Sequence, residues 1–274
     1  MFEVPTTLEA LHDMIGTYAA TGADASLIIQ RIHKSNSVRL DHRNKEKMQN
    51  FYDVLLKRFI GVGDALYNSG NGGGELERYE QLNSLTKTLY SMAQDAPDSA
   101  AAVWGRRLGI FQNAHAKRLR DSELVPLDSE EEFTAWPSSG TLLLFRALGH
   151  VFPMTDLRHV VTTPALLTLG QIVGQTPVRS VEDVMKGIFC AALMLEYTKE
   201  AKRIAPEGLA FLAGVLNLFS DDAENASAES PIPSFNSAPK IEELQQLRHN
   251  VIQFFKSGGS KNAELNLSLE KDKM

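Results

Sequence analysis

The sequence predicts an all-α fold, an irregular α-solenoid of stacked helical hairpins of the HEAT or armadillo kind. Apolar residues recur at helical spacing along most of the 274 residues. Short polar or glycine-rich segments separate these stripes, and the alternating pattern of strands is nearly absent. Consecutive hairpins with short loops are typical of solenoids. Because the stripes show no clean repeat period, an irregular helical bundle is the alternative.

The first half of the chain contains a series of apolar stripes that predict helices. We expect Thr7 to cap the first one, because its hydroxyl can accept a backbone N–H of the first turn. The second helix is expected to be short and to begin at Ile28. The glycine-rich stretch NSGNGGGE follows the third, and Pro97 stops the fourth. The stripes cover residues 8–18, 28–32, 48–62, 76–92 and 101–111.

Capping residues mark the helices of the second half more clearly than periodicity does, because these helices are apolar around most of their circumference. Thr163 before Pro164 predicts an N-cap with proline at the first helical position. Ser180 and Asp183 have the spacing of a capping box, and Pro206 opens the next helix. We expect Leu167 to lie in the core. The helix after Ser180 is expected to bury Val181, Val184, Met185, Ile188, Ala192 and Leu195.

Composition divides the chain into four parts. Residues 1–220 are predicted to form an α-helical repeat-like domain, followed by an acidic Ser/Pro-rich linker over 221–240. An amphipathic helix is expected over 241–256, and a polar mobile tail over 257–274. The helix has to bury its apolar sector on the domain or on a partner, and the acidic linker favours a partner. The candidate docking residues are Leu244, Leu247, Val251 and Phe255.

Charge is strongly segregated although the net charge is only -6. Between Ile28 and Ile60 there are eight basic residues and three acids, and between Asp121 and Ala135 six acids and no base. An acidic total argues against a protein that binds nucleic acid with its whole surface, but a local basic face can contact phosphate or an acidic partner. A solvated helix face is the alternative. The candidate contacts are Arg31, Lys34, Arg39, Arg43, Lys45 and Lys47.

The single cysteine and the absence of long apolar runs limit the class of protein. Cys190 cannot form an internal disulfide, which favours a reducing compartment such as the cytosol or nucleus. It lies in an apolar helical run, so we interpret it as a small buried hydrophobic residue. No apolar run reaches the roughly 20 residues of a membrane span. The N-terminus does not have the pattern of a signal peptide. We therefore expect a soluble protein.

The segment His150–Gln171 contains residue types that could form a hydrolase site. Thr155 would be the nucleophile, His159 or His150 the base, and Asp156 the residue that orients the imidazole. The same residues can instead cap and connect helices, and we favour this interpretation. The predicted structural hinge comprises Thr155, Asp156, Arg158, His159, Thr163 and Pro164.

The sequence has no phosphate-binding glycine loop, metal-spaced cluster or nucleophile elbow. We therefore predict that the protein is not an enzyme. We expect no catalytic residue, no cofactor and no metal.

A long segment resembles a known family. The stretch from Phe152 to Leu212 is similar to the nucleolar complex protein 14 family, and TLEALHDMI, IIQRIHK and NKEKMQNFYDVLL resemble its earlier helices in the same order. Met154 and Val160 depart from the family pattern within the hinge. The motifs that carry the resemblance are Phe152-Pro153, Thr155-Asp156, Arg158-His159, Thr163-Pro164-Ala165-Leu166-Leu167, Lys202-Arg203 and Pro206-Glu207.

This resemblance implies a function that composition alone does not. Members are nucleolar, non-catalytic scaffolds of the small-subunit processome, needed for maturation of small-subunit pre-rRNA. The implied partners are a Noc-type nucleolar protein bound as a heterodimer, an rRNA pseudouridine methyltransferase, other processome proteins and, as a further candidate, pre-rRNA; no membrane is implied. Family members are longer, so the chain resembles their helical core. The alternative function is a direct RNA-binding module that uses the basic face between Ile28 and Ile60.

Overall fold

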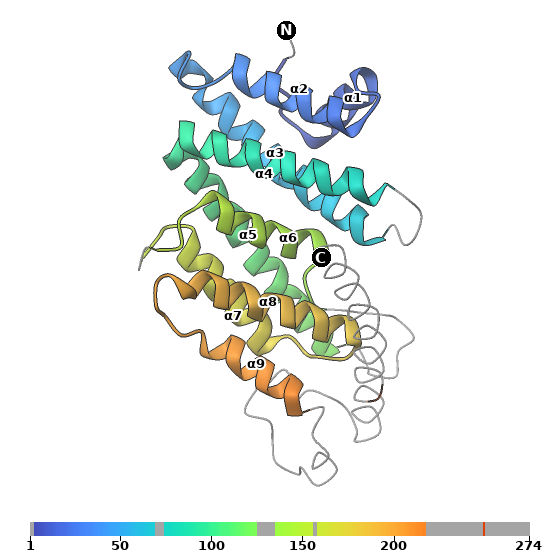
Figure 1. The fold of residues 1–274 in the computed structure, drawn as a ribbon, viewed down its shortest axis with the longest axis vertical. Helices are drawn as coiled ribbons and strands as arrows, with labels where there is room; N and C mark the ends of the chain where they lie inside the picture. The colour runs from blue at the N-terminus through green and yellow to red at the C-terminus, as the bar shows by residue number, and fades with distance from the viewer. Residues whose placement is uncertain (1–2, 69–73, 125–134, 156–157, 218–248, 250–274) are drawn as a thin grey trace, which may run out of the picture. The chain divides into compact units, whose positions relative to one another are not determined.

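The computed structural model describes residues 3–68, 74–124, 135–155, 158–217 and 249. These residues form α-helices and one 3-10 turn and contain no strand, which confirms the predicted all-α class (Figure 1). The solenoid arrangement stays a prediction. The helices are α1 (Leu8–Tyr18), α2 (Gly22–Ser35), α3 (Lys45–Asn68), α4 (Glu75–Asp95), α5 (Pro97–Leu124), α6 (Ser139–Val151), α7 (Thr162–Gln175), α8 (Val181–Lys199) and α9 (Pro206–Asn217), with η1 (His42–Asn44) before α3.

The chain divides into two compact units. Unit 1 comprises Met1–Ala116, Pro137–Thr168 and Leu195–Ile204. Unit 2 comprises Lys117–Trp136, Leu169–Met194 and Ala205–Met274. Helices α5, α7 and α8 contribute residues to both units. The predicted linker, amphipathic helix and tail lie outside the described residues except for position 249, so their boundaries stay predictions.

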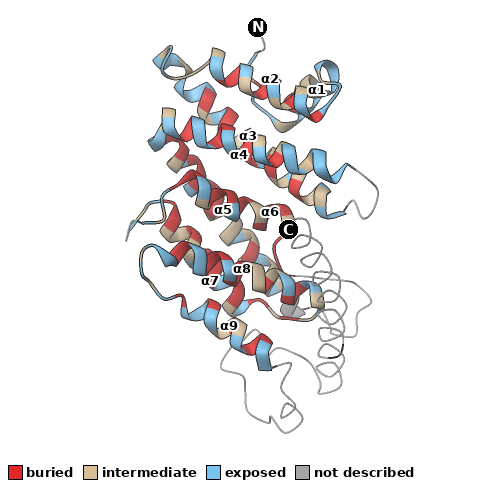
Figure 2. Cartoon of the chain, viewed as in Figure 1, coloured by how far each residue is buried: buried red, intermediate tan, exposed pale blue. Residues whose placement is uncertain are grey.

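Helix α3 is at the centre of unit 1, where it packs against α1, α4 and α6. Buried positions run along one side of α2, α3 and α4, and exposed positions along the other (Figure 2). Within this core the indole Nε1 of Trp104 donates to the hydroxyl of Tyr52 at 3.0 Å. The Trp104 and Phe152 rings also pack in a T-shaped arrangement, with ring centroids 6.2 Å apart. Aromatic packing therefore connects α3, α5 and the end of α6.

The contact between α3 and α6 is close because two glycines face each other. A Cβ added to Gly63 would lie 2.7 Å from the Cα of Gly140. A Cβ on Gly140 would lie 2.0 Å from the carbonyl oxygen of Ile60, which belongs to the backbone of α3. At the same place the Asp64 carboxylate accepts the backbone N–H of Gly140 at 2.6 Å. This charge-assisted bond satisfies one of the free amides at the start of α6.

Unit 2 has its own apolar core around Phe211. The ring of Phe211 occupies the space that a side chain at Gly187 would need. Trp136 and Phe211 pack in a T-shaped arrangement with centroids 6.0 Å apart, and Nε1 of Trp136 donates to the carbonyl of Pro177 at 2.9 Å. Cys190 is fully buried, and burial raises the pKa of its thiol to about 12. The prediction of a small buried hydrophobic residue at this position is confirmed.

The predicted local capping residues are confirmed where the partners lie close in sequence. The Thr7 hydroxyl accepts the N–H of Ala10 at 3.1 Å. Asp183 accepts the N–H of Ser180 at 3.0 Å, and the Ser180 hydroxyl accepts the N–H of Asp183 at 3.1 Å. The predicted start of the second helix at Ile28 is wrong, because α2 begins at Gly22. A capping box of Thr21 and Asp24 starts it.

The predicted buried face of α8 is also partly wrong. Val184 is buried as expected, but Leu195 is 38% exposed and Ala192 is exposed too. In α7, Leu167 is 63% exposed rather than in the core. Both helices are apolar around most of their circumference, so periodicity could not select the buried side. In α8 the fully buried positions include Cys190 and Ala191.

Substitution of Gly140 tests the close packing of α3 and α6. Gly140→Ala places a methyl group against backbone that cannot rotate away, so we expect a loss of about 1 to 3 kcal/mol in the free energy of unfolding. Gly105→Ala in α5 is the matched control, because a Cβ there has no neighbour within 4 Å. The control should be neutral or stabilise by up to about 1 kcal/mol. Chemical denaturation measures both, and equal stability of the two variants would contradict the close contact.

Candidate partner interface

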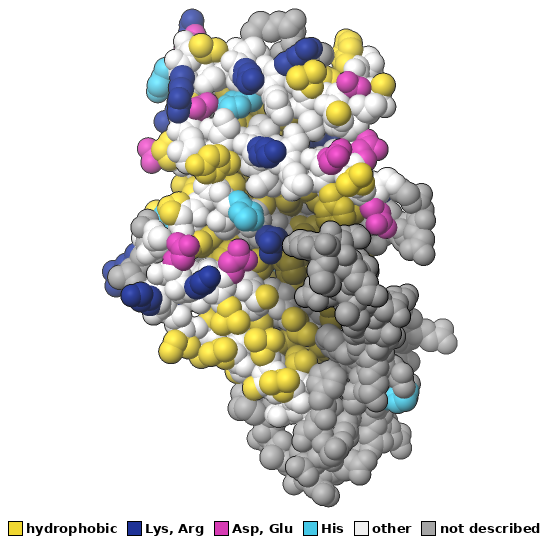
Figure 3. All heavy atoms as spheres, viewed as in Figure 1, with side chains coloured by type: hydrophobic (Ala, Val, Ile, Leu, Met, Phe, Trp, Pro, Cys, Tyr) yellow, Lys and Arg dark blue, Asp and Glu magenta, His cyan; other side chains and the backbone are white. Residues whose placement is uncertain are grey.

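The six basic residues predicted as partner contacts lie in one stretch of unit 1. Arg31 and Lys34 are in the last turns of α2, Arg39 is in the following loop, Arg43 in η1, and Lys45 and Lys47 at the start of α3. All six are exposed. On the face that Figure 3 shows, basic side chains over α1–α4 are separated by apolar, acidic and polar ones rather than merged into one patch.

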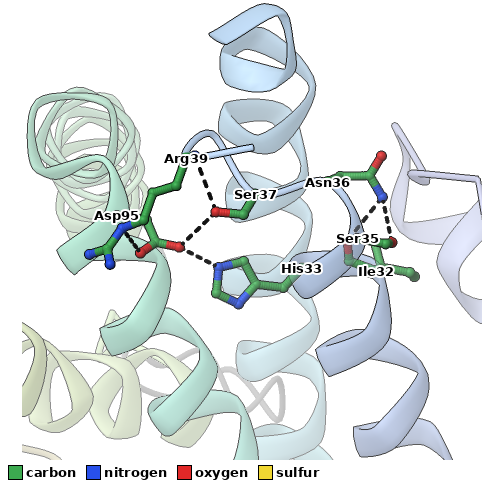
Figure 4. Close-up of polar contacts among 7 residues, drawn as sticks. All are labelled: Ile32, His33, Ser35, Asn36, Ser37, Arg39 and Asp95. Carbon is green, nitrogen blue, oxygen red and sulfur yellow. Dashed lines mark hydrogen bonds and ion pairs between the residues drawn. The ribbon is translucent and has the colours of Figure 1, made fainter. Parts of the chain in front are cut away.

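Asp95, the last residue of α4, organises this stretch (Figure 4). Its Oδ2 accepts the Ser37 hydroxyl at 3.2 Å and lies 3.0 Å from Nε2 of His33. Its Oδ1 forms an ion pair with Nε of Arg39 at 2.8 Å. The Ser37 hydroxyl also accepts the N–H of Arg39 at 3.3 Å. One carboxylate thus fixes the end of α2 and the loop after it, and Arg39 is part of that structure.

Arg43 is also paired, but locally and in solvent. Its guanidinium contacts both carboxylate oxygens of Asp41, with Nε 3.2 Å from Oδ1 and NH2 2.9 Å from Oδ2. Asp41 in addition accepts the N–H of Arg43 at 2.9 Å, which begins η1. Hydrogen bonds from Arg43 lower the pKa of the Asp41 carboxyl below its usual range. Arg43 remains 90% exposed at its side chain, so a ligand could still reach it.

The other four candidates are available for a partner. Among the described residues, Arg31, Lys34, Lys45 and Lys47 form no ion pair within 4 Å. The sequence could not separate these four from Arg39, because the partner of Arg39 is Asp95 in a different helix. The surface that can bind an anion is therefore smaller than the count of basic residues indicates. Its use stays a prediction.

The basic residues further along α3 belong to the packing of unit 1. Asp53 pairs with Arg107, which is buried, and with Lys57 at 3.2 Å. These two cations lower the pKa of Asp53, although burial acts in the opposite direction as the largest single effect. Arg58 donates to the side-chain carbonyl of Gln81 at 3.4 Å, and burial lowers its pKa. Arg107 and Arg58 are therefore occupied within unit 1, whereas Lys57 is paired but exposed.

His159 starts α7 through its side chain. Its Nδ1 accepts the backbone N–H groups of Val161 and Thr162 at 3.1 and 3.2 Å. The Thr163 hydroxyl in turn accepts the N–H of His159 at 3.1 Å. The predicted N-cap at Thr163 is therefore wrong, because Thr163 lies inside the first turn of α7 and supports the residue that caps it. Pro164 is in the same turn, where a missing N–H is tolerated.

Within the described residues, the remaining members of the candidate hydrolase site form no hydrogen-bonded catalytic arrangement. Thr155 is exposed, as is His150 at the end of α6. Arg158, which belongs to the predicted hinge, is exposed too. Asp156 lies outside the described residues. The described part of the chain contains no group of three or more His, Cys, Asp and Glu side chains placed to hold a metal ion. In the same part, we find no helix whose length and apolar content would suit a membrane span.

The Lys202-Arg203 motif forms the end of α8. Lys202 has a left-handed backbone with φ 51°, its N–H donates to Lys199, and the N–H of Arg203 donates to Thr198. This is a Schellman motif, in which glycine is the usual residue at the left-handed position. Sequence reasoning did not recognise this turn, because it expects glycine there. The predicted docking residues Leu244, Leu247, Val251 and Phe255 lie outside the described residues.

Comparison with known proteins identifies the family. The family model described as the Nop14-like family matches residues 1–269, nearly the whole chain. The chain belongs to the Nop14-like family. This confirms the resemblance seen in the hinge and in the earlier helices.

The chain is similar to proteins from distant eukaryotes. It is 28% identical over 246 residues to "Nucleolar protein 14" of Mus musculus and 29% identical over 245 residues to that of Homo sapiens, and each alignment covers 89% of this chain. It is 26% identical over 223 residues, 81% of this chain, to "Nucleolar complex protein 14" of Saccharomyces cerevisiae. The aligned region is 26%, 26% and 25% of those relatives, so the chain spans about a quarter of their length.

The support that Thr163 gives to the cap can be tested by substitution. Thr163→Ala removes the acceptor of the His159 N–H, and we expect a loss of about 1 kcal/mol in the free energy of unfolding. Thr163→Ser keeps the hydroxyl and should lose less. Thermal unfolding compares the two variants. If alanine and serine were equally stable, the hydrogen bond would not support the start of α7.

The role of Asp95 as the anchor of the basic stretch can also be tested. Asp95→Ala leaves the buried His33 without its partner, so we expect a loss of about 1 to 3 kcal/mol in the free energy of unfolding. Amide hydrogen exchange should also become faster in the loop between α2 and η1. Arg43→Ala is the control, because it removes a solvated pair and should leave stability unchanged. Unchanged exchange in the Asp95 variant would show that the loop is held by other contacts.

Proposed function

We propose that this chain is a helical section of a nucleolar protein that acts as a non-catalytic scaffold in small ribosomal subunit biogenesis. In this proposal it is a component of the small-subunit processome and is needed for maturation of small-subunit pre-rRNA. The observation that carries it is the family match over residues 1–269, together with relatives named nucleolar proteins. Because the chain spans a quarter of those relatives, the proposal concerns the part that this helical section plays.

The non-catalytic part of the proposal is supported by how the chemistry-bearing residues are used. Nδ1 of His159 accepts two backbone amides, and the Thr163 hydroxyl accepts a third. Cys190 is buried, and its raised pKa keeps the thiol protonated and poorly nucleophilic. Each of these groups has a role in packing or in helix capping, which suits a scaffold.

The proposed partners are those that the family resemblance implies. A Noc-type nucleolar protein would bind as a heterodimer, and the rRNA pseudouridine methyltransferase and other processome proteins would bind the same scaffold.

Direct binding of pre-rRNA is a second candidate function. It is favoured by the four exposed cations without ion pairs, Arg31, Lys34, Lys45 and Lys47. If phosphate contacts dominated, the affinity for RNA would fall steeply as salt concentration rises. Four such contacts make a small electrostatic footprint, so this function ranks below the protein scaffold.

The proposed function predicts the behaviour of the protein in cells. A tagged copy should be nucleolar and should sediment with particles that contain small-subunit pre-rRNA. Its depletion should cause unprocessed small-subunit pre-rRNA to accumulate while large-subunit rRNA continues to mature. Gradient sedimentation with RNA hybridisation measures both. Sedimentation away from these particles, or an equal defect in both subunits, would contradict the proposal.

A further inference from the structure

Helices α8 and α9 pack against each other as an antiparallel pair within unit 2. The ring of Phe211 in α9 lies where a side chain at Gly187 of α8 would stand. A Cβ added to Gly208, nearer the start of α9, would lie 3.6 Å from the Cα of Ala191, further along α8. Later residues of one helix therefore meet earlier residues of the other, which defines the pair as antiparallel. These four residues mark the contact line between the two helices, and all of them belong to unit 2.

Each helix of this pair carries an apolar stripe that is one residue beyond the contact line. Successive side chains of an α-helix are about 100° apart, so each stripe is turned by that angle from the contact line. Because the helices are antiparallel, the same turn on both of them points the two stripes to the same side. Figure 3 shows apolar side chains gathered over α8 and α9. This surface, the α8–α9 face, comprises Met185, Ile188, Ala192, Leu209 and Leu216.

The described part of the chain leaves the α8–α9 face open to solvent. Leu209 is 47% exposed and Leu216 is 69% exposed. Met185 is 37% exposed, and Ile188 between the two helices' exposed rows is half-buried. Along α8 the stripe advances by three and four residues in turn, which is the spacing of a helix that packs along another helix. The face therefore has the form that receives one further amphipathic helix.

We propose that the α8–α9 face binds residues 241–255 of the same chain, the amphipathic helix that the sequence predicts. In this segment Leu244, Leu247 and Val251 also follow one another at spacings of three and four residues. Stripes of the same period can interdigitate along the whole contact. Composition alone favours a partner for this helix, but composition does not show that unit 2 itself exposes a matching face.

The one described residue of the segment fits the orientation that docking requires. His249 is helical and exposed. On the predicted helix it lies about 140° to 160° away from Leu244, Leu247 and Val251. The exposed side of the segment is therefore the side opposite its apolar stripe. A helix that docks through that stripe would leave His249 in solvent.

The length of chain between α9 and the segment favours this occupant. Helix α9 ends at Asn217, and residues 218–240, 23 in number, precede the segment. A random-coil linker of that length spans about 26 Å root-mean-square, whereas α9 is only about 18 Å long. The segment can thus reach every part of the face. A tether of this kind also gives an effective concentration in the millimolar range, which a partner recruited from solution has to exceed.

Amide hydrogen exchange on the full chain tests whether the segment is held. Residues 241–255 should exchange at least about tenfold more slowly than residues 257–274, because a docked helix keeps its backbone hydrogen bonds closed. Leu209→Glu with Leu216→Glu should remove this protection, since docking would bury two unpaired charges. Leu76→Glu is the matched control: Leu76 is 73% exposed in α4 of unit 1, and its variant should keep the protection. Circular dichroism verifies that each variant is folded.

Competition with a synthetic peptide tests whether the chain's own segment occupies the face. The probe is a fluorescein-labelled peptide with the sequence of residues 240–256, and fluorescence anisotropy measures its affinity for the full chain. The probe should bind at least about tenfold more tightly to the variant Leu247→Glu with Val251→Glu than to the unchanged chain, because the variant's own segment vacates the face. The variant with Leu209→Glu and Leu216→Glu should not bind the probe.

Several results would overturn the inference. Protection that survives Leu209→Glu with Leu216→Glu would place the segment elsewhere, and equal probe affinity for the unchanged chain and the segment variant would mean that the face is empty. Protection that grows with protein concentration would assign the face to a second copy. Fast exchange of the free chain that slows only in purified pre-ribosomal particles would assign the segment to a partner. The nucleolar and pre-rRNA measurements test the proposed function separately.

Discussion

Unit 1 depends on the close approach of α3 and α6. Gly63 and Gly140 allow the two backbones to meet, and the Asp64 carboxylate then accepts the N–H of Gly140 at the start of α6. Because α3 also packs on α1 and α4, fixing α3 against α6 places the remaining helices of this core. The first residue of α3 is Lys45, one of the four exposed cations without an ion pair among the described residues. The same contact thus supports the core and positions one charge of the candidate interface.

The basic residues of unit 1 divide by what they contact. Arg39 is fixed to Asp95, and Arg107 is buried with Asp53, so their charges stabilise helix ends and helix contacts. The Arg107–Asp53 pair is costly to break, because Arg107 is buried and would be left without its partner. Lys45 and Lys34 are exposed to solvent and form no ion pair among the described residues, so a partner can bind them without breaking a contact within the fold. Binding energy from a negative partner is therefore available at the solvated residues without disturbing the fold.

The sequence predicts contacts between residues that are close in the chain. It does not reveal contacts between residues that are far apart in the chain. The caps at Thr7 and Ser180 involve partners three residues away, and their spacing reveals them. The anchor at Asp95 joins residues 58 and 62 positions apart, and no local pattern marks it. The buried side of α8 was missed for a different reason, since a helix apolar on all sides carries no signal that orients it.

The hinge segment explains why catalytic residue types occur in a protein proposed to be a scaffold. A helix start needs acceptors for its free amides, and histidine, threonine and aspartate are among the side chains that supply them. Nδ1 of His159 takes two of these amides, so this nitrogen cannot accept a proton from a nucleophile while α7 is intact. The geometry of a base and the geometry of this cap are therefore mutually exclusive at Nδ1. Sequence spacing alone does not distinguish them, because it does not specify which atom the imidazole nitrogen faces.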